Sequence, residues 1–338
     1  MVEFVLIQQY QENCLSQSLS NTPNSLIPIR PSSRIQRYIY IVCVLYMFVL
    51  ADCSGKGDAE RFEDTGGKSM MESFQTDYVS LDHPDILNLL FHPRPEWGAH
   101  SQSQNAKELT IPVDDGISIG ATLHNAGLPA PVILYFHGNG EIVADYDDLG
   151  PVYVGMGINF LPVDYRGYGR STGSPSVSGM LADSHKIFKW IRQWLREAGY
   201  SGPFIVMGRS LGSASALELA SYYGSEIDAL IIESGFADIL PLLRLVGVDI
   251  DRLGISDKDD LRHIEKIRNF VRPVLIIHAE FDHIIPFTDG QALYEASRSP
   301  DKRFLKIPGA DHNTIFSVGM KEYIREVGIL VHKGRGKN

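Results

Sequence analysis

The sequence predicts an α/β fold, in which a mostly parallel, twisted β-sheet carries helices on both faces. From about residue 107 onward, strand-like runs alternate with helix-like runs. Most of the strand-like runs are continuously apolar, which is typical of parallel strands that are buried on both faces. In such sheets ligands bind outside the carboxyl ends of the strands, so we expect functional residues directly after each strand.

The expected elements follow in order along the chain. Residues 107–113 and 117–124 are two strands around an Asp-Asp-Gly turn, which is a hairpin signal. The other strands are apolar runs that begin at Pro131, Ile158, Pro203, Asp228, Pro273 and Arg303. A helix follows the second of these, because apolar residues recur there at helical spacing. They are Leu181, Ile187, Trp190, Ile191 and Leu195. The last helix runs from about Thr314 to Val331.

Composition limits the classes of function. The chain has 338 residues, of which 44% are hydrophobic and 21% charged, so a sizeable core is possible. The net charge of −10 argues against nucleic acid as a partner, because phosphate binding needs a basic face. Cys14, Cys43 and Cys53 all precede residue 60. The body of the chain therefore contains no thiol nucleophile and no cysteine-based zinc site.

The first 90 residues differ from the rest. We expect disorder in residues 1–33, a signal or anchor in residues 34–53 and a linker in residues 54–90. A basic flank before the 14 apolar residues 38–51 favours an exported or membrane-anchored protein, although a membrane span needs about 20 residues. The alternative is a cytoplasmic protein whose translation starts at Met70 or Met71.

Two nearly identical motifs raise the question of a serine nucleophile. Gly208–Gly212 reads GRSLG and Gly169–Gly173 reads GRSTG, and both fit Gly-x-Ser-x-Gly. A nucleophile on this motif needs a strand running into the turn and a helix leaving it. Ser210 has both neighbours, whereas Ser171 follows its strand at a distance and precedes a loop. We therefore predict that Ser210 is the nucleophile and that Ser171 is a turn residue.

A serine nucleophile needs a base, and the base needs an orienting carboxylate. His312 follows the last strand and Asp282 follows the strand before it, so both lie at expected strand ends. The order Ser, Asp, His along the chain is the one that accompanies a strand–turn–helix serine. Glu280 and Asp311 are the rival acids. Asp282 is preferred because of its chain order.

An oxyanion hole completes such a site, because negative charge develops on the carbonyl oxygen during attack. One expected donor is the backbone N–H of Leu211, the residue after the serine. The other is the backbone N–H of Asn139, which lies in the glycine-rich turn HGNGE after an early strand.

Five motifs together resemble the α/β-hydrolase superfamily: HGNGE, DYRGYGRSTGSPS, GRSLGS, HAEFDHIIP and GADHN. The sequence looks closest to the compact serine-hydrolase branch whose members are labelled "alpha/beta hydrolase domain-containing". The resemblance implies an α/β-hydrolase domain over residues 91–333, with a small cap at about 237–270. It also implies Ser210 as nucleophile, Asp282 as acid and His312 as base.

The expected function is hydrolysis of carboxylic esters or thioesters with short-to-medium acyl chains. The substrate would be a small or lipid-like ester, and neither cofactor nor metal is expected. The alternatives are a serine peptidase on the same fold and a non-catalytic, anchored binding module. A metal site at His278, Glu280, Asp282 and His283 is disfavoured, because strand alternation separates His283 from the others. A dinucleotide site is disfavoured because Val143 stands where a third glycine is needed.

Overall fold

The computed structural model describes residues 78–96 and 105–332, and all of them belong to one compact unit, Thr76–Asn338. The segments expected to be disordered (1–33) and to act as a signal or anchor (34–53) lie outside the described residues. In the part of the chain that is described, no helix combines the length and apolar character that crossing a bilayer requires.

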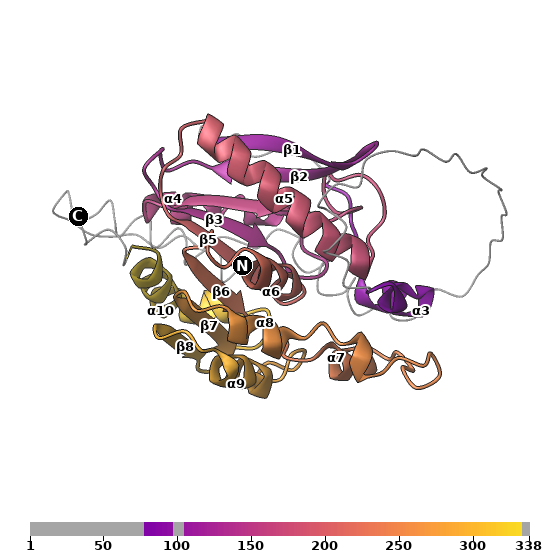
Figure 1. The fold of residues 1–338 in the computed structure, drawn as a ribbon. Helices are drawn as coiled ribbons and strands as arrows, with labels where there is room; N and C mark the ends of the chain where they lie inside the picture. Colours follow the sequence, from indigo (N-terminus) through magenta and orange to yellow (C-terminus); the bar gives the residue numbers. More distant parts are fainter. Residues whose placement is uncertain (1–77, 97–104, 333–338) are drawn as a thin grey trace, which may run out of the picture. The chain divides into compact units, whose positions relative to one another are not determined.

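The centre of this unit is a β-sheet (Figure 1) with the strand order β1-β2-β4-β3-β5-β6-β7-β8. The strands are β1 (Ala106–Asp114), β2 (Ile117–His124), β3 (Val132–Phe136), β4 (Asn159–Val163), β5 (Phe204–Arg209), β6 (Ala229–Glu233), β7 (Val274–Ala279) and β8 (Lys302–Ile307). β1 pairs with β2, and β2 with β4, in antiparallel fashion. From β4 to β8 every pairing is parallel. The prediction of a mostly parallel sheet is confirmed.

Helices cover both faces of the sheet (Figure 1). The helices of the described residues are α3 (Pro84–Leu90), α4 (Gly150–Gly155), α5 (Val177–Glu197), α6 (Gly212–Tyr222), α7 (Ile239–Leu245), α8 (His263–Asn269), α9 (Phe287–Ala296) and α10 (Ile315–His332), of which α3 and α7 lie to the side of the sheet (Figure 1). Side chains of α5, α6, α8 and α9 share one apolar cluster with alternate strand residues. Those of α4 and α10 share a second cluster with the intervening strand residues. Because successive strand residues point to opposite faces, the two clusters lie on opposite sides of the sheet.

Helix α5 shows how local sequence sets an element. The Ser176 side chain accepts a hydrogen bond from the Gly179 N–H at 3.0 Å, which caps the first turn. Four of the five residues of the predicted stripe are buried, while Trp190 is only partly covered. The chain leaves the helix at Gly199, whose φ of +84° favours glycine.

Residues 78–90 are folded, although we expected them to belong to a linker. They form a 3-10 turn, η2 (Val79–Asp82), and helix α3. Leu81, Ile86 and Leu90 are buried in the same cluster as α5 and α6. The spacing of Ile86 and Leu90 puts both on one helix face, which is what allows so short a helix to pack. The expected boundary at residue 91 therefore lies inside the folded unit.

The segment expected to form a cap, residues 237–270, contains α7, a 3-10 turn (η4, Asp257–Asp259) and α8. Ile239, Leu240 and Leu243 are buried in the cluster that also holds Leu81 and Ile86. These three residues therefore pack into the body of the molecule instead of roofing an open pocket. Nearby Leu242 is only partly buried, whereas Leu245 is 58% exposed.

Candidate active site

Ser210 lies on the turn between β5 and α6. Its φ of +51° is in the left-handed region, which a non-glycine residue adopts only under strain. Its N–H donates to the Glu233 carbonyl at 2.9 Å, which ties the turn to the neighbouring strand β6. The flanking glycines are needed for space: a Cβ on Gly208 would overlap the Gly212 carbonyl, and one on Gly212 would overlap the Phe136 carbonyl. The predicted strand–turn–helix context of Ser210 is confirmed.

The structure brings the three predicted side chains together in one hydrogen-bonded chain. His312 Nε2 lies 3.0 Å from Ser210 Oγ, and His312 Nδ1 lies 2.7 Å from Asp282 Oδ2. All three residues are less than a tenth exposed. An ionised carboxylate only accepts hydrogen bonds, so Nδ1–H donates to Asp282 and Nε2 is left to accept the proton of the serine hydroxyl.

Asp282 is held in its ionised form by its surroundings. Burial by itself raises the pKa of Asp282, but hydrogen bonds from His312, the Ile285 N–H and the Ser234 hydroxyl outweigh burial and lower the pKa to about 2. The Ile284 and Ile285 N–H groups donate to Oδ1 at 3.0 and 2.8 Å, and Ser234 Oγ donates to Oδ2 at 2.8 Å. Sequence reasoning missed Ser234, because only its fold position beside Asp282 identifies it.

The rival residues point elsewhere. Glu280 pairs with Lys306 at 2.8 Å and accepts the Gly309 N–H at 3.0 Å, whereas Asp311 accepts hydrogen bonds from its own turn at Asn313 and Thr314. Ser171 Oγ accepts the Gly120 N–H at 2.9 Å, as expected of a turn residue. Within residues 78–96 and 105–332 there is no cluster of three or more side chains suited to a metal ion.

The glycine loop, Gly138–Glu141, follows β3 and faces the turn of Ser210. The Gly138 N–H donates to Glu141 Oε2 at 2.6 Å, and Gly140 has a φ of +75°. Among the described residues, the backbone N–H groups of Asn139 and Leu211 donate to no protein acceptor. Both predicted oxyanion donors are therefore left available for another acceptor.

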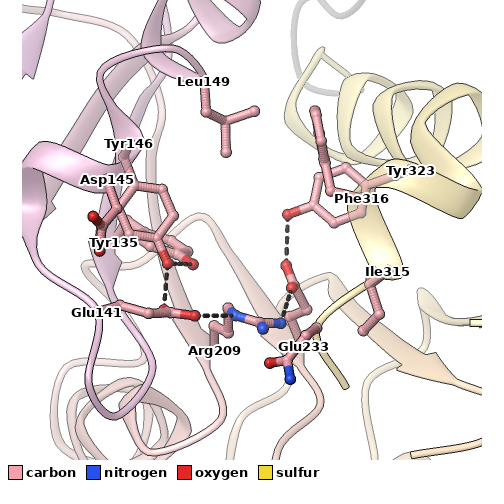
Figure 2. A pocket seen from close by; sticks show the side chains of 11 residues that line it. Tyr135, Glu141, Asp145, Tyr146, Leu149, Arg209, Glu233, Ile315, Phe316 and Tyr323 are labelled. Atoms are coloured by element: carbon pink, nitrogen blue, oxygen red, sulfur yellow. Dashed lines mark hydrogen bonds and ion pairs between the residues drawn. The ribbon is translucent and has the colours of Figure 1, made fainter. Parts of the chain in front are cut away.

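Arg209, which directly precedes Ser210, connects three parts of the site. Its guanidinium donates to Glu141 Oε1 at 2.9 Å and to Glu233 Oε1 at 2.7 Å (Figure 2). It also donates to the His312 carbonyl at 2.9 Å. Tyr146 and Tyr323 add hydroxyl hydrogen bonds to Glu141 and Glu233 at 2.5 and 2.7 Å. The guanidinium thus holds the glycine loop, strand β6 and the histidine loop around the serine turn.

In this ion cluster Arg209 and Glu233 are buried and Glu141 is partly buried, and the cluster lies beside a cavity of about 180 Å³ lined by the residues of Figure 2. Burial lowers the pKa of Arg209, but Glu141 and Glu233 together raise it well above its ordinary value, so the guanidinium stays charged. Arg209 is not among the site residues that the sequence predicts. Strand alternation could have placed it, because Ile205, Met207 and Arg209 point to the same side of the sheet.

Comparisons with known proteins agree with this architecture. Residues 127–248 match the family described as serine aminopeptidase, S33. The chain is 36% identical over 182 residues to lysophosphatidylserine lipase ABHD12 of Danio rerio, a match that covers 49% of this chain and 47% of the lipase. The chain therefore spans about half the length of that relative.

Two further matches extend over more of the chain. It is 30% identical over 241 residues to the uncharacterized protein Rv2307c of Mycobacterium tuberculosis, and this match covers 67% of this chain and 79% of that protein. The solved structure of the Pyrococcus furiosus esterase Pf2001 is similar with a TM-score of 0.59 at 19% identity, and covers 72% of this chain and 98% of the esterase chain. At that identity the structural likeness shows the shared fold.

Proposed function

This chain belongs to the α/β-hydrolase superfamily, and on that premise we propose that it is a serine hydrolase of carboxylic esters or thioesters. The observation that carries the proposal is the hydrogen-bonded chain from Ser210 through His312 to Asp282, which begins at a strained turn. The lipase name of the Danio rerio relative and the esterase fold support an ester substrate.

The proposed mechanism has two half-reactions. His312 Nε2 takes the proton of Ser210 Oγ while the oxygen attacks the acyl carbon, and the N–H groups of Leu211 and Asn139 bind the resulting oxyanion. His312 then gives the proton to the leaving alcohol or thiol, which leaves an acyl-serine. Water, deprotonated by His312, attacks the acyl-serine, and the acid departs as Ser210 regains its proton. Asp282 keeps the imidazole oriented and stabilises its positive charge throughout.

We further propose a lipid-like ester with a short-to-medium acyl chain as substrate. The support is the small size of the segment 237–270, whose partly covered apolar side chains are Ala237, Leu242, Val246, Leu253 and Ile264. Each additional buried methylene adds about 0.8 kcal/mol, or about a fourfold gain in kcat/KM, until the covered surface ends. On p-nitrophenyl esters, kcat/KM should rise from acetate to about butyrate–octanoate and then fall. A maximum at palmitate contradicts the chain-length proposal.

The second candidate is a peptidase, because the matching family is described as serine aminopeptidase. The same acyl-serine chemistry would then act on aminoacyl amides. Comparing aminoacyl p-nitroanilides with p-nitrophenyl esters separates the two candidates. Efficient amide cleavage without ester cleavage favours the peptidase.

The deciding experiment is labelling with a fluorophosphonate, followed by ester hydrolysis. The wild type and Ser171→Ala should be labelled and active, whereas Ser210→Ala should be unlabelled and slower by several powers of ten. Ser171→Ala is the matched control, because it changes the same residue in the near-identical motif. Equal losses in both variants would contradict the assignment, and a folded wild type without label would favour the non-catalytic binding module.

A further inference from the structure

We propose that the segment Leu90–Glu96, here called the N-terminal strap, positions the glycine loop for catalysis, and that the GRSTG loop anchors the strap. This proposal rests on the proposed function, since it gives the strap the task of aligning the Asn139 N–H. It also gives a role to the second Gly-x-Ser-x-Gly motif, which the catalytic mechanism does not use.

The strap contacts the glycine loop on both sides of the Asn139 side chain. Asn139 Nδ2 donates to the Leu90 carbonyl at 2.7 Å, and Asn139 Oδ1 accepts the His92 N–H at 3.0 Å. Arg94 Nε donates to the Gly140 carbonyl at 2.7 Å, and the Arg94 guanidinium also pairs with Asp145. The side chain of Asn139 and the carbonyl of the next residue, Gly140, are therefore both held by the strap.

The other side of the strap is held by the GRSTG loop. The Gly169 N–H donates to the Arg94 carbonyl at 2.9 Å, and the Glu96 N–H donates to the Gly169 carbonyl at 3.3 Å. Arg170 Nη1 adds a bond to Glu96 Oε2 at 3.1 Å. These bonds pair the strap with the loop as a short parallel bridge would. Only glycine fits at position 169, because a Cβ there would overlap the carboxylate of Asp164.

Tyr168 joins the anchor directly to the glycine loop. Its hydroxyl donates to Asn139 Oδ1 at 2.7 Å and accepts the His92 N–H at 2.8 Å. Together, the strap and Tyr168 occupy both the oxygen and the nitrogen of the Asn139 side-chain amide. On the opposite side, Glu141 holds the Gly138 N–H and is itself held by Arg209. The Asn139 N–H is thus fixed between two independent supports, of which the strap is one.

A strap that positions the Asn139 N–H and a strap that only packs on the surface predict different kinetic results. A donor that stabilises charge only in the transition state affects kcat and the binding of tetrahedral mimics more than it affects KM. Complete loss of one such donor costs about 10²–10³ in kcat, so a displaced donor should cost part of that. If the strap only packs on the surface, its variants should change the free energy of unfolding without lowering kcat relative to KM.

The test uses the full-length chain with the changes Arg94→Met and Asn139→Ala, which keep every backbone N–H. The matched control is Arg252→Met. The Arg252 guanidinium also bonds the N-terminal part of the unit, since it lies 2.5 Å from the Asp85 carboxylate, and the Arg252 side chain is 61% exposed. We expect kcat for p-nitrophenyl butyrate to fall about 10- to 100-fold in both strap variants, with KM nearly unchanged. Inhibition by a trifluoromethyl ketone should weaken in proportion, Arg94→Lys should regain most of the rate, and Arg252→Met should match the wild type.

A second measurement does not depend on activity. Hydrogen exchange at the amides of His92 and Gly169, both bonded in the strap contacts, should speed up about tenfold or more in the strap variants but not in Arg252→Met. Unchanged exchange, or a kcat loss no larger than that of Arg252→Met, overturns the strap proposal. A folded wild type that neither takes the fluorophosphonate label nor cleaves esters overturns the proposed function instead, while the exchange result still decides the strap.

Discussion

Replacing Arg209 with methionine should be strongly destabilising, because it leaves the buried Glu233 carboxylate and the partly buried Glu141 carboxylate without a cation. The guanidinium bonds Glu141, Glu233 and the His312 carbonyl, and the Arg209 side chain is only 11% exposed. Removing one partner of a buried ion pair costs about 3–5 kcal/mol, since the remaining charge stays desolvated. We therefore expect the free energy of unfolding to fall by about 3–5 kcal/mol at pH 7.

The pKa of Glu141 gives an independent magnitude. Burial alone raises this pKa, whereas Arg209 and the Tyr146 hydroxyl lower it to about 2. Relative to an ordinary value near 4.3, a shift of about two units corresponds to roughly 3 kcal/mol. Because the folded-state pKa is lowered, this stabilisation is complete above about pH 4.3 and is lost as the pH falls towards 2. The difference in free energy of unfolding between wild type and Arg209→Met should therefore become smaller as the pH falls from about 5 to about 3.

The assay is urea unfolding followed by circular dichroism at pH 7, 5 and 3.5. Adding Glu141→Gln to Arg209→Met should recover part of the loss, because it removes one of the uncompensated charges. Arg252→Met, which breaks an exposed pair, should cost less than about 1 kcal/mol. A loss below about 1 kcal/mol for Arg209→Met, or a loss that is the same at all three pH values, would refute the reasoning.

Three further predictions follow from the site, the core and the N-terminal residues. Asp282→Asn should lower kcat by up to about 10⁴-fold, because the imidazole loses its orienting acceptor. The kcat of Glu280→Gln and of Asp311→Asn should stay within a fewfold of the wild type. Steady-state kinetics in which Asp311→Asn has the lowest kcat would contradict the assignment of Asp282. Leu243→Ala should lower the free energy of unfolding by about 2–5 kcal/mol, because Leu243 is wholly buried, and unchanged urea unfolding would contradict that packing. Full-length protein should sediment with membranes, whereas a version that starts at Met70 should remain soluble and active; the same fraction for both would argue against an anchor in residues 34–53.

Much of the fold could be predicted because its signals are local. Strand β3 is continuously apolar, and β5, β6 and β7 are apolar up to Arg209, Glu233 and His278 near their carboxyl ends. The strand-end rule places Ser210, Asp282 and His312 at one edge of the sheet. Their hydrogen-bonded arrangement agrees with that rule, although their catalytic roles remain predictions.

The parts that could not be predicted depend on contacts between distant segments or on backbone atoms. Arg209 pairs with Glu141 and Glu233, which are 68 and 24 residues away in the chain, and no periodicity encodes such pairs. The N-terminal strap bonds through the Leu90 carbonyl and the His92 N–H, groups that every non-proline residue carries. The apolar run of α7 could equally cover a pocket or enter the core, because both environments select the same side chains.

The two Gly-x-Ser-x-Gly motifs should follow different courses under neutral drift. Gly212 lies outside the left-handed region and is required because any Cβ would overlap the Phe136 carbonyl, so every substitution is excluded by space. Gly173 has a φ of +81°, and the nearest atom that a Cβ there would meet is the flexible end of Ile117, at 3.1 Å. Asparagine tolerates that backbone conformation far better than most residues do. Sequences that descend from this gene can therefore lose the GRSTG motif at Gly173 while the loop conformation is kept. They cannot lose the GRSLG motif at Gly212.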